Sequence, residues 1–390
     1  MKTVYSEDHN LHAGLLDPRG GEAWRESSEC PARANNVASE IREQQLGEIV
    51  VPQPFDESKY LRLHAPDYLE FLKTVWDDWV DSGENSPNAR PDTFVGAGMR
   101  YADTRSVVGR LGRYSFDATT PFVAGSWQAI RASADVALTG AELIRGGDRH
   151  AFSACRPPGH HATATYCGGY CYLNNNALAA QSLLDGGASR IAILDVDYHH
   201  GNGTQSLFYR RNDVLTISLH ADPALEYPHF LGYADEPGEG EGHGFNLNIP
   251  LDFGTGWDVY ETALRDALSH IERFSPDALV VALGLDTFSG DPTTHFDLTT
   301  DDVERMGATI STRGLPTLVV LAGGYSVEWI GRNSVRFLHG LEAAGAPVFA
   351  AGIPFALVCD RATRCNVGHG ITGGSPWTDT AGAHGGCRRG

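Results

Sequence analysis

The sequence predicts a single α/β domain built on a mostly parallel central β-sheet, with helices on both faces and long loops around the functional site. Two observations carry this prediction. Short apolar runs alternate with longer amphipathic segments through the middle of the chain, which is the pattern of buried parallel strands and their connecting helices. In addition, a chain of 390 residues with 42% apolar residues is long enough to enclose one large core.

Four apolar runs are predicted to be strands, because each is short and nearly continuous in apolar character. They are residues 190–197, 214–219, 278–285 and 317–321. Helices are expected over residues 126–145, 173–186, 257–274, 300–313 and 326–343. The helix at 300–313 has the clearest start, since Thr299 or Thr300 can cap it and two aspartates follow in its first turn.

Polar or aromatic residues that suit a functional site follow each predicted strand at the same end. They are Asp195 and Asp197 at the end of the first strand with His199 and His200 after it, His220 and Asp222 after the second, Asp286 after the third, and Tyr325, preceded by Gly323 and Gly324, after the fourth. In open parallel sheets, ligands bind at the carboxyl ends of the strands. Four strands that deliver such residues to one edge therefore indicate a functional site there.

Three segments lack this periodicity. Residues 82–120 are rich in Gly, Ser, Asn, Arg and Pro and are predicted to be a long loop insertion, and residues 234–244 form a second, acidic loop. Residues 346–390 contain nine Gly and three Cys, and two Asp against four Arg give them a net charge of +2. We expect this tail to be a poorly ordered appendage to a domain that spans residues 1–345.

The charge balance limits the possible partners. Asp and Glu number 49 against 30 Lys and Arg, so the formal net charge is −19. A negative field repels phosphate backbones, which argues against a nucleic acid partner, and it favours a cationic partner or substrate. The simpler alternative is that the charge only maintains solubility.

The cysteines and the N-terminal sequence indicate the compartment. Seven cysteines without a CxxC pair are expected to be free thiols in a reducing environment. The first ten residues, MKTVYSEDHN, lack the apolar stretch of a signal peptide, and no run reaches the roughly 18 apolar residues of a membrane span. We therefore expect a cytoplasmic protein with no membrane partner.

Asp197, His199 and Asp286 are the candidate metal ligands. Residues two apart on a strand project to the same face, so Asp197 and His199 are expected to act together. With Asp286 from a neighbouring strand they would offer two carboxylates and one imidazole, which leaves positions open for water and substrate. The alternative for the first two residues alone is an ion-paired Asp and His at the end of a strand.

The segment Arg156–Pro157–Pro158–Gly159–His160–His161 supplies candidate acid–base residues. A proline-rich turn argues against a mobile surface position for the two histidines. Hydrolysis of an amide needs a base for the attacking water and an acid for the leaving amine, and two histidines with different pKa values can divide these roles. Asp195 and Asn202 are their candidate partners. Tyr325, after two glycines, could donate a hydrogen bond to an oxyanion, although most tyrosines serve packing alone.

Taken together, the motifs GHH, DVDYHHGNGTQ, LGLDTFSGDP and LAGGY resemble the histone deacetylase family in order and spacing. The resemblance runs from YSEDH near the N-terminus, through HAPDYLEFL at residues 64–72, to the helix that ends near residue 343. Within the family, the sequence is most similar to bacterial acetylpolyamine amidohydrolases. This similarity rests on FLGYADE (230–236), GGYCYLNN (168–175), SFDA (115–118) and GSW (125–127).

This resemblance implies an arginase–deacetylase fold and a catalytic site with one Zn²⁺ or Fe²⁺ held by Asp197, His199 and Asp286. It implies that His161 is the general base and then the acid, that His160 is held by Asp195 as an electrostatic or proton-handling partner, and that Tyr325 stabilises the oxyanion. Asn202 stands beside His161 where some relatives have Asp.

The resemblance also implies structural K⁺ and a narrow substrate tunnel. One K⁺ site maps onto Asp195, Asp197, His199, Ser218 and Leu219, and another maps onto backbone oxygens near Phe208, Arg211 and Val214. Gly169, Tyr170 and Tyr227 match the tunnel walls, and residues 82–120 match a segment that narrows the entrance through homodimerisation. Where those relatives carry an acidic residue for the distal ammonium of the substrate, this chain has Thr119, with Asp117 two residues earlier.

The function expected from these residues is hydrolysis of the acetyl amide of small cationic amines, such as acetylputrescine, acetylcadaverine or acetylspermidine. A protein lysine deacetylase is the first alternative, and it would need an open rim around the site. A non-catalytic binding or metal-storage protein is a second alternative, although no expected ligand is missing. A ureohydrolase is a third, but it would require a two-metal cluster with more Asp ligands.

Overall fold

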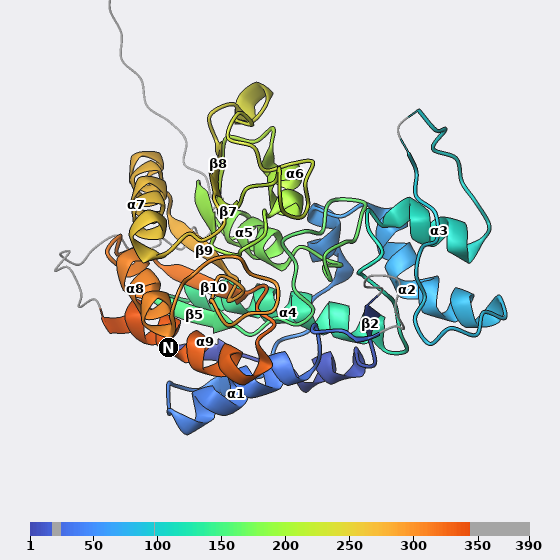
Figure 1. Cartoon of the computed structure of the whole chain (residues 1–390), viewed down its shortest axis with the longest axis horizontal. Coiled ribbons are helices and arrows are strands. Elements are labelled where there is room, and N and C mark those ends of the chain that lie inside the picture. Colours follow the sequence, from blue (N-terminus) through green and yellow to red (C-terminus); the bar gives the residue numbers. More distant parts are fainter. Residues whose placement is uncertain (18–24, 97, 344–390) are drawn as a thin grey trace, which may run out of the picture. The chain divides into compact units, whose positions relative to one another are not determined.

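An eight-stranded sheet runs through the centre of the computed structural model, which describes residues 1–17, 25–96 and 98–343 (Figure 1). Its strand order is β4-β1-β5-β10-β9-β6-β7-β8, and every neighbouring pair is parallel. The strands are β1 (Lys2–Val4), β4 (Ile49–Val50), β5 (His150–Ser153), β6 (Ile191–Asp195), β7 (Val214–Ala221), β8 (Asn246–Leu251), β9 (Ala278–Leu283) and β10 (Thr317–Leu321). A short antiparallel pair, β2 (Leu16–Asp17) and β3 (Arg25–Glu26), lies outside this sheet. The predicted α/β class is confirmed.

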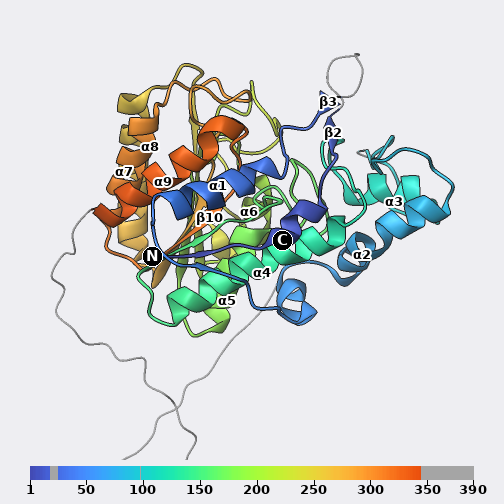
Figure 2. The ribbon, with the colours of Figure 1, turned by 90° about the horizontal axis from the view of Figure 1, so that it is seen from below.

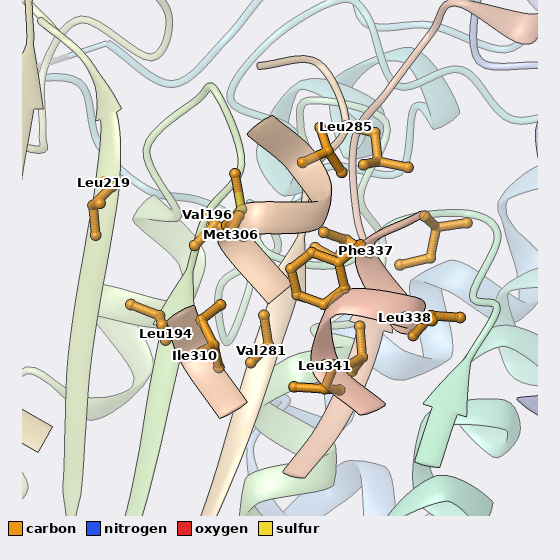
Figure 3. Close-up of a cluster of buried hydrophobic side chains, with 14 of the residues drawn as sticks. Leu194, Val196, Leu219, Val281, Leu285, Met306, Ile310, Phe337, Leu338 and Leu341 are labelled. Atoms are coloured by element: carbon orange, nitrogen blue, oxygen red, sulfur yellow. The ribbon is translucent and has the colours of Figure 1, made fainter. Parts of the chain in front are cut away.

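Both faces of the central strands are buried, which explains their continuous apolar runs. Along β6, Ala192 and Leu194 join one apolar cluster, and Ile191 and Ile193 join another on the opposite face. β9 alternates in the same way. Figure 3 shows the first cluster, where Leu194 and Val281 from two strands lie near residues of the covering helices. Helices must therefore cover both faces.

Nine α-helices occur among the described residues. They are α1 (Ala32–Glu43), α2 (Pro66–Asp81), α3 (Val107–Tyr114), α4 (Ser126–Arg145), α5 (Asn175–Asp185), α6 (Asn202–Phe208), α7 (Trp257–Phe274), α8 (Thr300–Ser311) and α9 (Val327–Ala343). α1, α7, α8 and α9 contribute to the apolar cluster on one face of the sheet, while α4, α5 and α6 contribute to the cluster on the other. Figure 2 shows α8 and α9 on one side of β10 and α4 and α5 on the other.

A third apolar cluster lies beyond the sheet, between α2, α3 and α4. Phe71 of α2 stacks on Tyr114 of α3, with 4.6 Å between the ring centroids. Ser106 caps α3 through a hydrogen bond from the amide of Gly109. The segment 82–120, predicted from composition to be a loop throughout, therefore contains one helix that is packed into the domain.

The five predicted helices are present as α4, α5, α7, α8 and α9, and the four predicted strands are present as β6, β7, β9 and β10. Thr299 and Asp302 form a reciprocal capping box at the start of α8, in agreement with the predicted N-cap. The described residues fall in one compact unit, and none of their helices is long and apolar enough to cross a membrane. The predicted tail, residues 346–390, lies outside the described residues.

Candidate metal centre and active site

Side chains from five chain segments meet beyond the carboxyl ends of the central strands. Asp195 is the last residue of β6, and Asp197 and His199 follow it in the next loop. Asp286 follows β9, and Tyr325 follows β10. His160 and His161 come from the loop after β5, and Glu226 and Tyr227 from the loop after β7. The parallel topology thus assembles residues that are more than 150 positions apart in the sequence.

Asp197, His199 and Asp286 form a group that can hold one metal ion. One ligand atom from each residue lies within 4.8 Å of the others. His199 Nδ1 is 3.1 Å from Asp286 Oδ2 and 3.3 Å from Asp197 Oδ1. Both carboxylates are fully buried, while the imidazole is 14% exposed. Two carboxylates and one imidazole are a donor set that suits Zn²⁺ or Fe²⁺.

The electrostatics of this group also favour a bound cation. Burial and the charge of Asp197 raise the pKa of Asp286 to about 7. Burial alone would lower the pKa of His199, but hydrogen bonds with Asp197 and Asp286 raise it to about 10. The three side chains thus retain a proton among them at neutral pH, and a metal ion would take the place of that positive charge.

Backbone amides fix the two carboxylates. Gly323 N–H donates to Asp197 Oδ2 at 2.7 Å, and Tyr198 N–H donates to Asp286 Oδ1 at 3.0 Å. A Cβ atom at Gly323 would collide with the carboxylate oxygens of both residues. Glycine at position 323 is therefore required by this close approach of the backbone to the site.

The two adjacent histidines have different partners and different charges. His160 Nδ1 lies 3.0 Å from Asp195 Oδ2, and His161 Nδ1 lies 2.7 Å from Asn202 Oδ1. Although burial favours a neutral ring, the negative charges of Asp197 and Asp195 raise the pKa of His160 to about 9. Burial and the nearby positive charges of His160 and His199 lower the pKa of His161 well below its usual value. His161 is therefore the neutral ring of the pair.

Tyr325 is positioned by residues that the sequence did not single out. Asp291 Oδ2 accepts hydrogen bonds from the backbone amides of Tyr325 at 2.5 Å and Ser326 at 2.8 Å. The buried guanidinium of Arg33 lies 4.8 Å from the ring centroid of Tyr325 and donates to the carbonyl oxygens of Ala322 and Gly324. Burial raises the pKa of Tyr325 well above its usual value, so its hydroxyl remains a hydrogen-bond donor.

A pocket of about 350 Å³ leads to His161, His199 and Tyr325. Its other lining residues are Thr119, Gly169, Tyr170, Glu226, Tyr227, Pro292, Thr293 and His295. The Tyr227 ring is perpendicular to that of His161, with 5.0 Å between their centroids, and the Tyr170 ring lies 5.6 Å from that of Tyr325. Gly169 and Tyr170 both have left-handed backbones, with φ of 54° and 63°. Of the four residues predicted for the tunnel, Gly169, Tyr170 and Tyr227 line this pocket, and Asp117 does not.

Asp117 lies behind the pocket wall rather than on it. Its Oδ2 accepts hydrogen bonds from Gly169 N–H and from the Tyr227 hydroxyl, each at 2.7 Å. Its Oδ1 accepts a hydrogen bond from Thr119 N–H at 2.9 Å. Thr119 and Glu226, which come from different loops, both line the pocket, whereas Asp117 does not.

The residues named for structural K⁺ lie in two places. Ser218 pairs in register with Asp195 beside the metal group, and its hydroxyl is 2.8 Å from His220 Nδ1. In the second place, the Phe208 carbonyl accepts a hydrogen bond from Arg211 N–H at 2.9 Å, just before β7 begins at Val214.

The fold and the site can be compared with known proteins. Residues 27–341 match the histone deacetylase domain. The chain is 51% identical over 346 residues to acetylpolyamine amidohydrolase 1 of Pseudomonas aeruginosa, covering 88% of this chain and 99% of that protein. It is 44% identical over 341 residues to acetylpolyamine amidohydrolase of Mycoplana ramosa, covering 87% and 99%.

A solved structure is also similar to this chain in fold and sequence. The crystal structure of acetylpolyamine aminohydrolase from Burkholderia pseudomallei superposes with a TM-score of 0.83 at 37% identity and covers 88% of this chain and 99% of that chain. The domain match and these similarities show that the chain is an enzyme of the deacetylase and amidohydrolase type and that it belongs to the histone deacetylase family.

Proposed function

We propose that this enzyme hydrolyses the acetyl amide of small cationic amines, among them acetylputrescine, acetylcadaverine and acetylspermidine, to acetate and the free amine. The observation that carries the proposal is the pocket itself, which is lined by His161, by Tyr325, by His199 of the metal group and by the aromatic residues Tyr170 and Tyr227. The names of two similar relatives, acetylpolyamine amidohydrolases of Pseudomonas aeruginosa and Mycoplana ramosa, support the substrate class.

Asp197, His199 and Asp286 would hold one Zn²⁺, or Fe²⁺, in the active enzyme. When bound, such an ion polarises the acetyl carbonyl and lowers the pKa of a water molecule. His199 Nδ1 lies 3.3 Å from Asp197 Oδ1 and 3.1 Å from Asp286 Oδ2, so the three side chains direct possible ligand atoms toward one another.

His161 would act as the general base and then as the general acid. Its Nδ1 is engaged with Asn202 Oδ1, which leaves Nε2 free to accept the proton of the attacking water. His161 would then return this proton to the nitrogen of the leaving amine when the C–N bond breaks. His160, held by Asp195, would supply a positive charge beside it and keep His161 neutral before the reaction begins.

Tyr325 would donate a hydrogen bond to the carbonyl oxygen of the substrate as negative charge develops there. Arg33 and Asp291 hold the backbone and the ring of Tyr325, so its hydroxyl needs little rearrangement to reach this oxygen. Such preorganised donors account for a large part of catalysis in hydrolases.

Structural K⁺ and a homodimer are further parts of the proposal. Oxygen ligands near Asp195 and Ser218, and the backbone around Phe208 and Arg211, suit a hard monovalent cation. The segment 82–120 would narrow the pocket entrance in a dimer, which would exclude folded proteins as substrates.

Acetate release by the zinc-loaded protein tests the proposal. We expect N-acetylputrescine and N-acetylcadaverine to be hydrolysed faster than an acetyl-lysine peptide. Tyr325→Phe should lower kcat on the order of 10²- to 10³-fold, because it removes one oxyanion donor. Faster turnover of the peptide would instead favour the alternative, a protein lysine deacetylase, which the match to the histone deacetylase domain also allows.

A further inference from the structure

Glu226 is the acidic side chain on the lining of the active-site pocket. It lies on the loop after β7, beside Tyr227, and lines the pocket together with His199 and His295. Within the described part of the chain, no other carboxylate and no Lys or Arg lines this pocket. Among the lining residues, Glu226 is therefore the one that offers a carboxylate to a cationic group of a substrate.

Thr119 and Asp117 do not offer a negative charge to a ligand in the pocket. Thr119 lines the same pocket but is neutral. Asp117 directs one carboxylate oxygen to Gly169 and Tyr227 and the other to Thr119, so its carboxylate serves the wall itself.

The carboxylate of Glu226 is held in place and still has capacity to bind a ligand. Its Oε2 accepts a hydrogen bond from the Tyr198 hydroxyl at 3.0 Å, and its Oε1 accepts one from Tyr227 N–H at 2.9 Å. A carboxylate can accept about four hydrogen bonds. Among the described residues, no cationic side chain forms an ion pair with Glu226. A fixed, half-buried carboxylate without a counter-charge is suited to a cationic ligand.

We infer that Glu226 is a specificity-determining residue, which binds the distal ammonium group of the substrate while the acetyl group lies at His161 and Tyr325. This inference rests on the proposed function and identifies the substrate class as amides with a second, charged nitrogen. A charge-assisted hydrogen bond in a partly desolvated pocket is stronger than a neutral one. The aromatic ring of Tyr227, adjacent in the sequence, would contact the methylene chain and the cation.

A pair of substrates that differ only in charge tests the inference. N-acetylputrescine carries a terminal ammonium, and N-butylacetamide has the same carbon chain without it. We expect Glu226→Gln to raise the KM of N-acetylputrescine on the order of tenfold and to change kcat/KM of N-butylacetamide less than twofold, because Gln keeps the size and loses the charge. Glu241→Gln, at an exposed position outside the pocket, is the matched control and should change neither substrate.

Binding measurements separate this inference from the proposed function. In the Tyr325→Phe background, calorimetry with N-acetylputrescine should show a Kd about tenfold higher for Glu226→Gln, with the Kd of N-butylacetamide unchanged. If the wild-type enzyme released acetate from neither amide, the proposed function would fail, and the binding result would still decide the role of Glu226. An equal loss for both ligands, or no loss for the cationic one, would overturn the inference.

Discussion

At the scale of single residues, the position of Tyr325 depends on Asp291. This carboxylate is buried, and one oxygen binds two consecutive backbone amides, those of Tyr325 and Ser326. Its other oxygen binds the amide and hydroxyl of Thr293, which lines the pocket. Asp291 thus ties the turn that carries the oxyanion donor to the pocket wall.

We expect Asp291→Asn to lower kcat about tenfold while KM changes less, because the amide can accept from only one side and the Tyr325 turn would loosen. The measurement is steady-state kinetics of acetate release, with metal content determined in parallel. Asp297→Asn, at a nearby exposed position, is the control. A fall in kcat explained by loss of the metal, or a change in KM alone, would contradict a positioning role.

The predicted strand ends indicated that Asp197, His199 and Asp286 lie close together, and the structure groups these three residues. The strand spacing assumed for Asp197 and His199 does not apply, because β6 ends at Asp195 and both residues lie in the loop after it. The sequence did not indicate Arg33, Asp291 or Glu226. Arg33 acts through backbone carbonyls 289 and 291 positions away, and no local pattern carries that information. Asp291 lies in the motif LGLDTFSGDP, together with the candidate metal ligand Asp286. This closeness in the sequence was the available signal for a role of Asp291 at the site. Glu226 lies in a loop, where only the fold decides which side chains face the pocket.

At the scale of elements, Asp117 fastens three loops together. Its carboxylate binds Gly169 from the loop before α5, Tyr227 from the loop after β7, and Thr119 in its own loop. Phe116, the preceding residue, stacks on Tyr227 with 6.2 Å between the ring centroids. Asp117 therefore connects two residues of the pocket wall, Gly169 and Tyr227, that come from different loops.

Two substitutions separate the hydrogen bond between Asp117 and Tyr227 from the other hydrogen bonds of Asp117. Tyr227→Phe keeps the apolar wall and loses one hydrogen bond, so we expect the free energy of unfolding to fall by about 1 kcal/mol and KM to change little. Asp117→Ala leaves both the Gly169 amide and the Tyr227 hydroxyl without their partner, so we expect a larger loss and a rise in KM for the acetylated amine. Urea unfolding and kinetics measure both effects. If the two variants showed the same free energy of unfolding and the same KM, Asp117 would not be needed to hold the pocket wall in place.

Several of the strands and helices that the sequence did not predict are short or atypical. β5 has only four residues, HAFS, and β8 is an edge strand that contains Pro250, so neither shows a long apolar run. α3 contains two glycines, which lower helix propensity, and its stability comes from packing on α2. α2 carried a recognisable signal, a proline at its first position followed by apolar residues at helical spacing. For β5, β8 and α3, tertiary contacts rather than local sequence determine that the element forms.

At the scale of the whole molecule, the fold buries several neutral histidines away from the metal group. His64 accepts a hydrogen bond from Asn174 N–H at 3.1 Å, and its Nδ1 lies 2.9 Å from the Thr163 carbonyl. Burial lowers the pKa of His64 to about 4, that of His9 to about 4 and that of His12 to about 3. Each ring has an ordinary pKa near 6.5 in the unfolded chain. The unfolded state therefore binds more protons than the folded state between these pH values.

This difference in bound protons determines whether stability rises or falls with pH. Because the unfolded state takes up the extra protons, the free energy of unfolding should fall as the pH is lowered from about 6.5 to about 4. Each buried histidine contributes a slope of at most about 1.4 kcal/mol per pH unit. His64→Gln should therefore lower the slope by up to that amount, whereas His243→Gln, at an exposed position, should leave it unchanged. Denaturant unfolding at several pH values between 4.5 and 7 measures the slope of the free energy of unfolding against pH. The same slope in His64→Gln as in the wild type would show that His64 does not cause the acid sensitivity.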